Sequence, residues 1–372
     1  MKKINITYIL SDIQKAIAFE WIAEHIDKSR FDLSFILLNP NDSPLERFLL
    51  EHTIPVYRVR YEGKKSIPKA FFKVRQLLKK LKTEVVHCHL FAACVVGLTA
   101  ARSLGIKKKI HTRHHSTFHH EYFPKAVFYD KMINRLSSDI VAISHNVQEI
   151  LTQKEKVKDK KIHLIHHGFD LEEFTKIDTN LINTLKKKYD LVGFEPVIGV
   201  VARQVHWKGI QFIIPAFEQL LQQYPNAKLV LTNANGDFKT DIQALLKNIP
   251  TKNYIEIEFE ENVTSLFHLF DVYVHTPINA EVEAFGQTYI EALASGIPSV
   301  FTLSGIAHEL IENEKNALVV DYQNSVAILE AIKRILGDKN LANTLKMNGI
   351  ADVQHSFHLQ TYIQKLEKLY TL

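Results

Sequence analysis

The sequence predicts an α/β protein made of two domains, each built around a doubly wound parallel sheet. At 372 residues the chain is longer than one typical domain. Short, continuously apolar segments typical of buried parallel strands alternate with helical patterns along its whole length. A polar stretch after Ile165 separates two such alternating series, so each series predicts a domain of its own.

The first series runs from Ile4 to Ile165. Its apolar runs are four to seven residues long and are bounded by polar or turn residues, as expected of strands. Its longest amphipathic segment, Ser66–Lys82, places apolar residues at helical spacing. The expected strands are Ile4–Leu10, Leu33–Leu38, Val56–Val59, Val85–His89, Lys109–Thr112, Asp139–Ile143 and Ile162–Ile165. The expected helices are Ala16–Ile26, Pro44–His52, Ser66–Lys82, Phe91–Leu104, Phe123–Leu136 and Val147–Gln153.

The second series repeats the same alternation and ends in three helices. The expected strands are Val197–Val201, Lys228–Thr232, Ile255–Ile257, Val272–His275, Ser299–Thr302 and Ala317–Val320. The expected helices are Ile210–Gln223, Asp237–Lys247, Val263–Leu269, the helix within Glu283–Pro298, Ile306–Glu312, Ser325–Leu336, Leu341–Gly349 and Leu359–Leu369. In sheets of this kind ligands bind at the carboxyl ends of the strands, and two such domains facing each other make a cleft.

Composition excludes several classes of protein. A net charge of +5 and a pI near 8.8 are mildly basic, which is weaker than the bias of a nucleic-acid-binding protein. Two cysteines, Cys88 and Cys94, lack the spacing of a metal site and fit a reducing, cytoplasmic setting. The longest uncharged apolar run, Leu90–Ala101, is too short to span a membrane.

The stretch Glu283–Pro298, EAFGQTYIEALASGIP, combines a loop, a helix start and two carboxylates. Gly286 lets the backbone approach a ligand, and the helix that follows presents free N–H groups that favour an anion. Glu283 and Glu291 can bind hydroxyls while the backbone binds a phosphate, which suits a sugar nucleotide. In the alternative interpretation Thr288 and Glu291 form a capping box, and Glu291 merely closes the helix start.

Arg203 and Lys208 lie five residues apart after the first strand of the second series. The loop between them ends at Gly209 and opens a helix. Two cations at the carboxyl end of a strand, beside a helix N-terminus, form a candidate diphosphate-binding site. The alternative is a pair of surface cations on an ordinary strand-to-helix connection.

The segment 110–120 is dense in histidine, with five histidines among the ten residues from His111 to His120. It follows an expected strand, so its imidazoles can hydrogen-bond a sugar hydroxyl or organise an acceptor. A metal site is a rival interpretation, but Glu121 is the only carboxylate close in sequence. A polar loop without a ligand is the third interpretation.

Taken together, Arg203-x4-Lys208-Gly209 and Glu283-x7-Glu291 resemble the retaining GT-B glycosyltransferases of family 4, whose hallmark is a Glu-x7-Glu element. The resemblance covers nearly the whole chain, with weaker matches at Ile140–Ser144 and His166–Asp170. It implies two Rossmann-like domains facing across a cleft. The implied bounds are an acceptor domain at 1–172, a nucleotide-sugar donor domain at 173–356, and a C-terminal helix at 357–372 that returns to the first domain.

The resemblance also implies a role for each residue of the Glu283–Pro298 stretch. Glu291 is expected to hold the ribose hydroxyls of the nucleotide. Glu283 is expected to contact hydroxyls of the donor sugar near the reacting face. Phe285, Gly286 and Gln287 are expected to offer backbone N–H groups to the sugar and phosphates.

For the remaining positions the resemblance implies charge neutralisation and an acceptor side. Arg203 and Lys208 are expected to neutralise the diphosphate leaving group, and because no Asp-x-Asp motif occurs, neither a metal nor another cofactor is expected. His114 is the expected histidine near the donor sugar, with His115 as the alternative.

Two positions depart from the family pattern. The loop Ser11–Lys15 lacks the Gly-Gly pair that many members have near the donor phosphates. The turn Asn233–Gly236 replaces a Gly-x-Gly turn, and Asn tolerates the same left-handed conformations.

The expected function is transfer of a sugar, with retention, from a UDP- or GDP-sugar to a saccharide or lipid-linked acceptor, as in polysaccharide biosynthesis. The alternatives are a nucleotide-sugar epimerase on a similar fold and a catalytically silent protein that binds a nucleotide sugar. The segment Phe118–Leu136 mixes aromatic and basic residues, so peripheral contact with the inner membrane face is a further expectation, and no nucleic-acid partner is expected.

Overall fold

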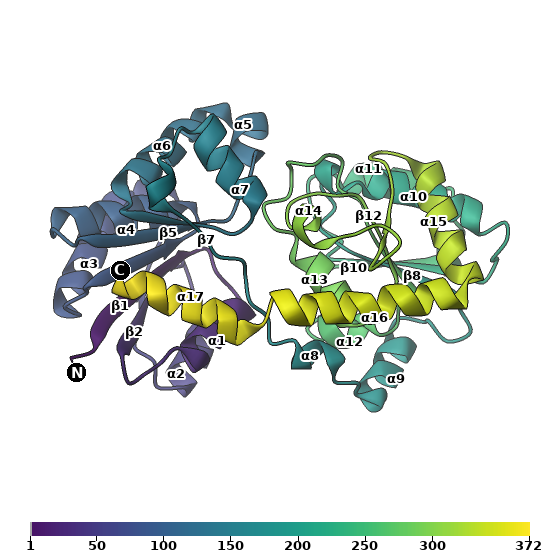
Figure 1. Cartoon of the computed structure of the whole chain (residues 1–372), viewed down its shortest axis with the longest axis horizontal. Helices are drawn as coiled ribbons and strands as arrows, with labels where there is room; N and C mark the ends of the chain where they lie inside the picture. Colours follow the sequence, from purple (N-terminus) through teal and green to yellow (C-terminus); the bar gives the residue numbers. More distant parts are fainter. Residues whose placement is uncertain (1) are drawn as a thin grey trace. The chain divides into compact units, whose positions relative to one another are not determined.

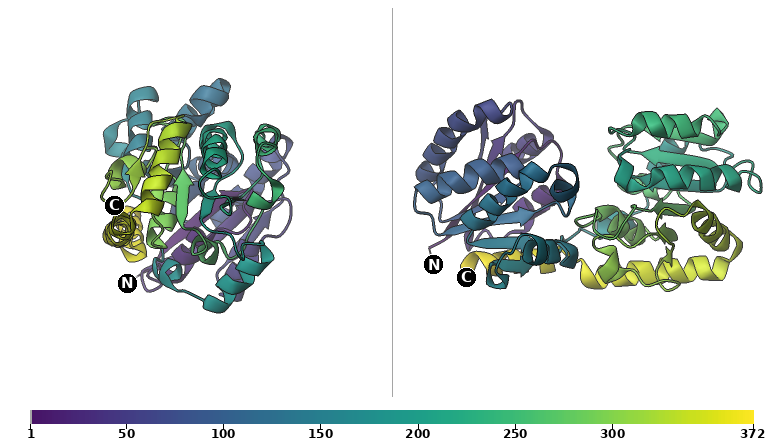
Figure 2. Two further views of the ribbon diagram at one scale, coloured as in Figure 1. Left: turned by 90° about the vertical axis from the view of Figure 1, so that its right-hand side faces the viewer. Right: turned by 90° about the horizontal axis from the view of Figure 1, so that it is seen from above.

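Parallel β-strands form two separate sheets in the computed structural model, which describes residues 2–372 (Figure 1). The chain divides into two units. Unit 1 comprises the residues up to Phe169 together with Leu359–Leu372, and unit 2 is Asp170–His358. Each sheet has helices on both of its faces (Figure 2). The α/β class and the two Rossmann-like domains predicted from the sequence are confirmed.

The seven strands of unit 1 run in the order β3-β2-β1-β4-β5-β6-β7, and all of their pairings are parallel. The chain thus adds strands outward from β1 on one side and then reverses, so that β1 and β4 are neighbours at the switch point of the sheet. The strands are β1 (Ile4–Ser11), β2 (Phe31–Leu38), β3 (Val56–Val59), β4 (Val85–His89), β5 (Lys108–Arg113), β6 (Asp139–Ala142) and β7 (Ile162–Leu164).

The helices of unit 1 cover both faces of its sheet. On one face Ile9, Val86 and Cys88 belong to a buried apolar core with α3, α4 and α6. On the other face Tyr8 packs against Phe19 of α1 and reaches α17. The helices are α1 (Ile17–His25), α2 (Pro44–Glu51), α3 (Ile67–Lys80), α4 (Phe91–Ser103), α5 (Phe118–Tyr122), α6 (Val127–Leu136), α7 (His145–Glu149) and α17 (Leu359–Thr371).

Helix α17 belongs to unit 1 although it ends the chain (Figure 1). The Tyr370 hydroxyl lies 2.9 Å from His87 Nδ1 and also hydrogen-bonds the Tyr8 hydroxyl, all within the buried core. Gly168 packs so closely on this helix that a Cβ there would lie 2.4 Å from Tyr362 Cβ. His87 is therefore a buried core histidine whose ring nitrogens both have hydrogen-bond partners.

The six strands of unit 2 repeat the same order, β10-β9-β8-β11-β12-β13, and are again all parallel. Here β8 and β11 are the neighbours at the switch point. The strands are β8 (Val197–Val201), β9 (Lys228–Thr232), β10 (Tyr254–Ile257), β11 (Val272–His275), β12 (Ser299–Phe301) and β13 (Leu318–Val319).

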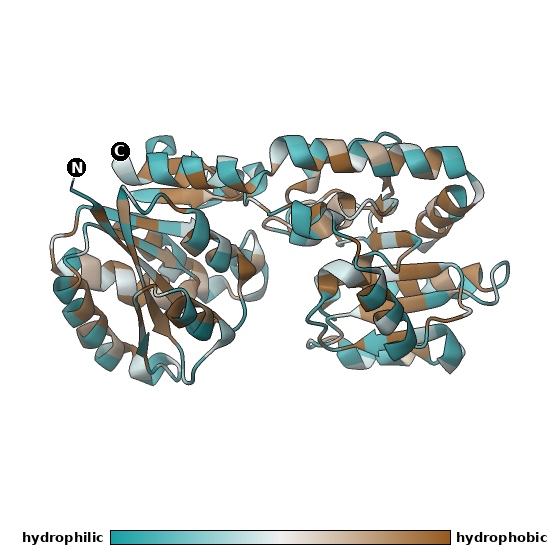
Figure 3. Cartoon of the chain, turned by 90° about the horizontal axis from the view of Figure 1, so that it is seen from below, coloured by the Kyte–Doolittle hydropathy of each residue, from teal (hydrophilic) through white to brown (hydrophobic). Residues whose placement is uncertain are grey.

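The core of unit 2 also has two sides. Apolar residues of β8, β9 and β11 pack with α10, α11 and α15, whereas Tyr273 and Phe301 face Phe267 of α12 and Tyr289 of α13. Many strands are largely apolar, and many helices have one apolar and one polar side (Figure 3). The helices are α8 (Glu172–Thr175), α9 (Thr179–Lys188), α10 (Ile210–Leu220), α11 (Lys239–Leu246), α12 (Val263–Phe267), α13 (Gln287–Ala294), α14 (Ala307–Leu310), α15 (Ser325–Gly337) and α16 (Lys339–Ser356).

Three stretches differ from the sequence prediction. Residues 178–180, expected to be a polar boundary, begin α9, and Asp178 caps it by accepting from the backbone N–H groups of Asn180 and Leu181. The single helix expected at Phe123–Leu136 is instead a short turn followed by α6, with α5 before it. Helix α16 continues to Ser356, seven residues beyond its predicted end at Gly349. Within residues 2–372, no helix has the length and apolar character needed to cross a membrane.

Candidate active site

The carboxyl ends of β8, β11 and β12 bring the predicted donor residues together in unit 2. Gly209 follows β8 with a φ of +74°, and a Cβ there would lie 1.8 Å from the carbonyl oxygen of Thr276, which follows β11. Gly305 follows β12 with a φ of +58°, and a Cβ there would lie 2.9 Å from the Glu283 Cβ. Both positions therefore require glycine, and this close packing fixes where Glu283 sits.

Glu283 is buried and lies between two nitrogen groups. Lys208 Nζ donates to its Oε1 at 2.5 Å, and His275 Nε2 lies 3.4 Å from the same oxygen. The Ser304 hydroxyl accepts from the Glu283 backbone N–H at 3.1 Å, which holds the loop against β12. Burial acts to raise the pKa of Glu283, but the Lys208 ammonium and the nearby His275 imidazole outweigh it and hold that pKa below its ordinary value. The carboxylate is ionised in this environment.

Gly286 is the N-cap of α13, with a φ of +86°. A Cβ there would lie 2.7 Å from the Tyr289 ring, so the position admits little else. Phe285 is buried and Gln287 is exposed at the first helical position. The capping box of Thr288 and Glu291 is not formed, because Gly286 is the cap and no side chain caps this helix. The first N–H groups of an uncapped helix lack intrahelical partners, so they are available to a ligand.

Glu291 lies one turn further along α13 and is half-buried. Its carboxylate makes no hydrogen bond or ion pair with residues 2–372. Burial raises its pKa to about 7, and the nearby Lys208 acts in the opposite direction. Glu283 and Glu291 thus share one helix start but have opposite shifts of pKa.

Arg203 and Lys208 have different surroundings. Lys208 is committed to Glu283, whereas Arg203 is exposed, and its guanidinium has no hydrogen bond or ion pair within the described part of the chain. The turn after β9 is formed as its sequence indicated, because Asn233 adopts a φ of +61°. In unit 1, Asp12 adopts a φ of +51° in the loop after β1, so an aspartate takes the left-handed position there without a glycine.

His114 lies in unit 1, after β5. Its Nε2 is 2.9 Å from His89 Nδ1, and its ring stacks on His167 with centroids 5.7 Å apart. Burial, and then the nearby His167, lower the pKa of His114 to about 3. The imidazole is therefore neutral at physiological pH and can donate or accept a hydrogen bond.

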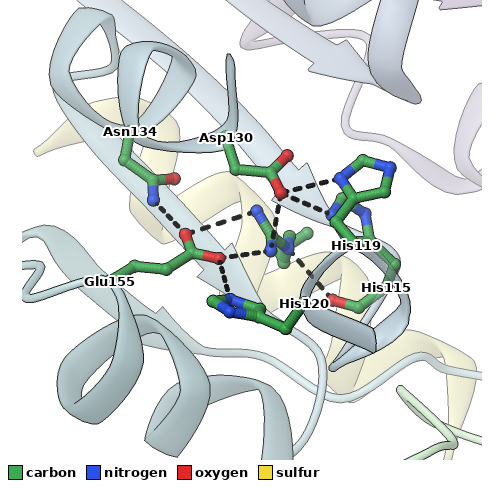
Figure 4. A network of polar contacts seen from close by, with 7 residues as sticks. His115, His119, His120, Asp130, Asn134 and Glu155 are labelled. Carbon is green, nitrogen blue, oxygen red and sulfur yellow. Dashed lines mark hydrogen bonds and ion pairs between the residues drawn. The ribbon is translucent and has the colours of Figure 1, made fainter. Parts of the chain in front are cut away.

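The neighbouring histidines belong to a different group of side chains (Figure 4). His115 and His119 both contact Asp130 of α6, and His120 contacts Glu155 at 3.2 Å. Arg113 connects the two carboxylates, donating to Glu155 at 2.6 Å and to Asp130 at 3.3 Å. A pocket of about 240 Å³ in unit 1 is lined by residues that include Cys94, His111, Arg113, His114, His115, Phe118, His119 and Asp130.

Sequence reasoning missed three of these groups. His275 is the last residue of β11, a strand that the sequence predicts. Its position at the end of that strand, shortly before the Glu283 loop, is the signal that could have identified it. Asp130 and Glu155 are separated in sequence from the histidines they contact, and no local pattern indicated them.

Two family models match the chain. One, described as Glycosyl transferases group 1, matches residues 182–352, and one described as Glycosyltransferase Family 4 matches residues 21–173. Between them they cover most of both units.

Individual relatives share about a quarter or less of their aligned residues with this chain. The capsular polysaccharide biosynthesis glycosyltransferase CapM of Staphylococcus aureus is 27% identical over 65% of this chain and 63% of its own length. An Escherichia coli UDP-Gal:alpha-D-GlcNAc-diphosphoundecaprenol alpha-1,3-galactosyltransferase is 21% identical over 81% of this chain and 79% of its own length. The crystal structure of Anabaena HepE in complex with UDP-glucose has a TM-score of 0.83 at 20% identity, covering 99% of this chain and all of that one.

Proposed function

The chain belongs to the GT-B glycosyltransferases of family 4, and from that premise we propose that it transfers a sugar from a nucleoside-diphosphate donor to a saccharide or lipid-linked acceptor. The observation that carries the proposal is the group formed by Lys208, Glu283 and the uncapped start of α13 at the carboxyl ends of β8 and β11. This edge of a doubly wound sheet is where such folds bind ligands.

Each donor residue has a part in this proposal that its environment supports. The ionised Glu283 binds hydroxyls of the donor sugar near the bond that breaks. The backbone N–H groups at Gly286 and Gln287 bind the phosphates, and Glu291, whose carboxylate has no partner among residues 2–372, binds the ribose hydroxyls. Phe285 anchors the loop through its backbone oxygen, which accepts from Ile306 N–H at 2.9 Å.

The leaving group is stabilised by cations of the protein in the proposed reaction. Cleavage of the anomeric bond builds negative charge on the diphosphate, and preorganised cations lower that barrier. Arg203 is exposed and uncommitted, so it can pair with the diphosphate without breaking an existing contact. We propose that Arg203 and Lys208 do this without a metal and that the transfer retains anomeric configuration.

A UDP-sugar is the donor we propose, and a lipid-linked saccharide is the acceptor class. Support comes from the Anabaena structure, which is a complex with UDP-glucose, and from the E. coli relative, whose name includes a UDP-sugar and a diphosphoundecaprenol-linked acceptor. His114 of unit 1 is the residue we propose to contact the reacting sugar, because its neutral imidazole can exchange hydrogen bonds with hydroxyls.

A lipid-linked acceptor lies at a membrane surface, and the segment that contains α5 and α6 has side chains suited to contact such a surface. Phe123, Phe128 and Tyr129 are 55%, 71% and 46% exposed, and Lys125 and Lys131 are exposed beside them. Apolar side chains with flanking cations favour an anionic bilayer surface. Phe128→Ser should reduce sedimentation with phosphatidylglycerol vesicles, whereas Phe72→Ser, at a 69% exposed position on α3, should not. Equal sedimentation of both variants and the parent would contradict the proposed contact.

The test of donor binding uses calorimetric titration with UDP, GDP and their sugars. One nucleotide class should bind, and Arg203→Ala should weaken it by about 10- to 100-fold, the loss expected for a charge-assisted hydrogen bond. Lys239→Ala is the matched control, because Lys239 is a cation of the same unit paired with exposed Glu258. Binding unaffected by Arg203→Ala, or no binding of any nucleotide, would refute the donor site.

The test of transfer follows the release of nucleoside diphosphate, which also detects slow hydrolysis without acceptor. Glu283→Gln should abolish this release, but the variant should still bind the nucleotide that the parent protein binds. An epimerised sugar nucleotide with no release would favour the epimerase alternative, and binding without turnover would favour the silent one.

A further inference from the structure

His115, His119 and Asp130 of unit 1 bring three potential metal-ligand atoms within 4.8 Å of one another. His115 Nε2 lies 3.3 Å and His119 Nδ1 lies 2.7 Å from Asp130 Oδ2. Figure 4 shows both rings turned toward this carboxylate. His115 lies in the loop before α5, His119 lies in α5 and Asp130 lies in the first turn of α6, so a ligand bound to all three would join these segments.

The atoms and spacings match what a zinc-like ion requires. Zinc bonds imidazole nitrogen and carboxylate oxygen at about 2.0–2.2 Å, so two ligand atoms of a tetrahedral site lie roughly 3.3–3.5 Å apart. The His115–Asp130 distance already has this value, and the shorter His119–Asp130 contact needs a shift of less than about 1 Å. Two imidazoles and one carboxylate form the ligand set typical of a zinc site with an open fourth position.

Asp130 also has an unused ligand atom. Its side chain is 1% exposed, and Oδ1 has no hydrogen-bond partner within residues 2–372. A buried carboxylate oxygen without a partner is costly. Oδ1 of Asp130 can therefore face an ion without losing a hydrogen bond within residues 2–372.

The formal charges of the surrounding network favour a cation. The guanidinium of Arg113 lies between the two buried carboxylates. Its contact with Glu155 is the shorter one, at 2.6 Å, and its contact with Asp130 is 3.3 Å long. Asn134 donates a further hydrogen bond to Glu155. Glu155 thus has the closer contact with the cation, whereas Asp130 faces the same guanidinium at the longer distance, together with His115 and His119. Buried charges are normally paired or coordinate metals.

We propose that His115, His119 and Asp130 bind a divalent transition-metal ion of the Zn²⁺ class, with its open coordination position directed into the 240 Å³ pocket that all three residues line. The ion clamps α5 to α6 and thereby orders the histidine-rich segment after β5. The sugar transfer proposed above needs no metal, because Arg203 and Lys208 are its proposed leaving-group cations. The inference does not rest on that function.

The test measures Zn²⁺ alone, by equilibrium dialysis of the full chain after removal of metals with a chelator. One tightly bound ion per chain is expected. His119→Ala and His115→Ala should each weaken that site by at least about tenfold, the lower end of the loss seen when merely a supporting partner is removed. His120→Ala is the matched control, because His120 lies beside His119 but contacts Glu155 instead. It should keep the parent affinity.

A second measurement does not depend on how the variants fold. X-ray absorption of the parent loaded with one equivalent of Zn²⁺ should show two imidazole ligands and light-atom oxygen scattering at about 2.0–2.2 Å. No stoichiometric binding, equal binding by His119→Ala and His120→Ala, or a spectrum without imidazole ligands would each overturn the proposal. Nucleotide binding in unit 2 is measured separately, so failure of one proposal leaves the other standing.

Discussion

Replacing Lys208 with Gln should destabilise unit 2, because it leaves Glu283 buried without its cation. The side chains of Lys208 and Glu283 are 16% and 11% exposed, and their atoms are 2.5 Å apart. Removing one partner of a buried ion pair lowers the free energy of unfolding by about 3–5 kcal/mol. Because this pair is slightly exposed, we expect a loss near the lower end, about 3 kcal/mol. The exposed pair Lys239–Glu258, with side chains 30% and 71% exposed at 2.6 Å, is the matched control and should cost less than about 1 kcal/mol.

The assay can follow unit 2 alone, because the chain has two tryptophans, and Trp21 lies in unit 1 and Trp207 in unit 2. In a Trp21→Phe background, urea unfolding monitored by fluorescence reports on Trp207. Lys208→Gln should lower the midpoint by about 1 M, given a slope near 3 kcal/mol/M for a unit of this size. Lys239→Gln should leave the midpoint nearly unchanged.

A double-mutant cycle with Glu283→Gln separates the pair from other effects. If the carboxylate left unpaired is the cause, the double variant is more stable than the sum of the single effects predicts, by about 1–3 kcal/mol. The Glu283 pKa lies below its ordinary value of 4.5, so its contribution is complete above pH 4.5 and is lost as the pH falls toward the lower folded-state value. The difference between parent and Lys208→Gln should therefore shrink in that acidic range. Equal midpoints for Lys208→Gln and Lys239→Gln, or additive single effects, would refute the reasoning.

Two further predictions concern the same site. The folded-state pKa of Glu291 is raised to about 7 from an ordinary 4.5, so its effect on stability becomes unfavourable as pH rises from 4.5 to 7. Glu291→Gln should therefore stabilise unit 2 more at pH 8 than at pH 4 in the same urea assay, while weakening nucleotide binding. An identical gain in stability at both pH values would contradict the burial of this charge. Gly209→Ala should cost roughly 2–5 kcal/mol, because the added Cβ meets the Thr276 carbonyl at a left-handed backbone position, whereas Gly337→Ala, where nothing lies within 4 Å, should be neutral or stabilising.

The fold could be predicted from the sequence because parallel sheets leave a strong local signal. Strands buried on both faces are continuously apolar, as in Val197–Val201, and each is followed by a helix that returns the chain to the same edge. Helix α9 was missed because its apolar residues, Leu181, Ile182 and Leu185, are few among lysines and asparagines. There the cap by Asp178, rather than apolar periodicity, marks where the helix begins.

The site was less predictable where contacts join distant segments. The Glu283–Glu291 spacing lies on one helix start, so its geometry follows from local sequence. Asp130 contacts His119 from another helix. The sequence gives little support to a metal site here, because Glu121 is the only carboxylate close in sequence to the histidines. The folding of α6 against the histidine segment supplies the carboxylate, and no pattern within either segment specifies that contact.

Two carboxylates eight residues apart have environments that push their pKa values in opposite directions, and such pairs have separate roles in many active sites. Glu283, paired with Lys208, stays ionised across the physiological range and can stabilise positive charge that develops on a sugar as its anomeric bond breaks. Glu291, with a pKa of about 7, can hold a proton when another negative group arrives. In the proposed donor complex a diphosphate would add such charge, and Glu291 is the carboxylate proposed to tolerate it as a neutral hydrogen-bonding group. In the proposed transfer Lys208 pairs with both Glu283 and the leaving group, and the exposed Arg203 is the proposed second cation.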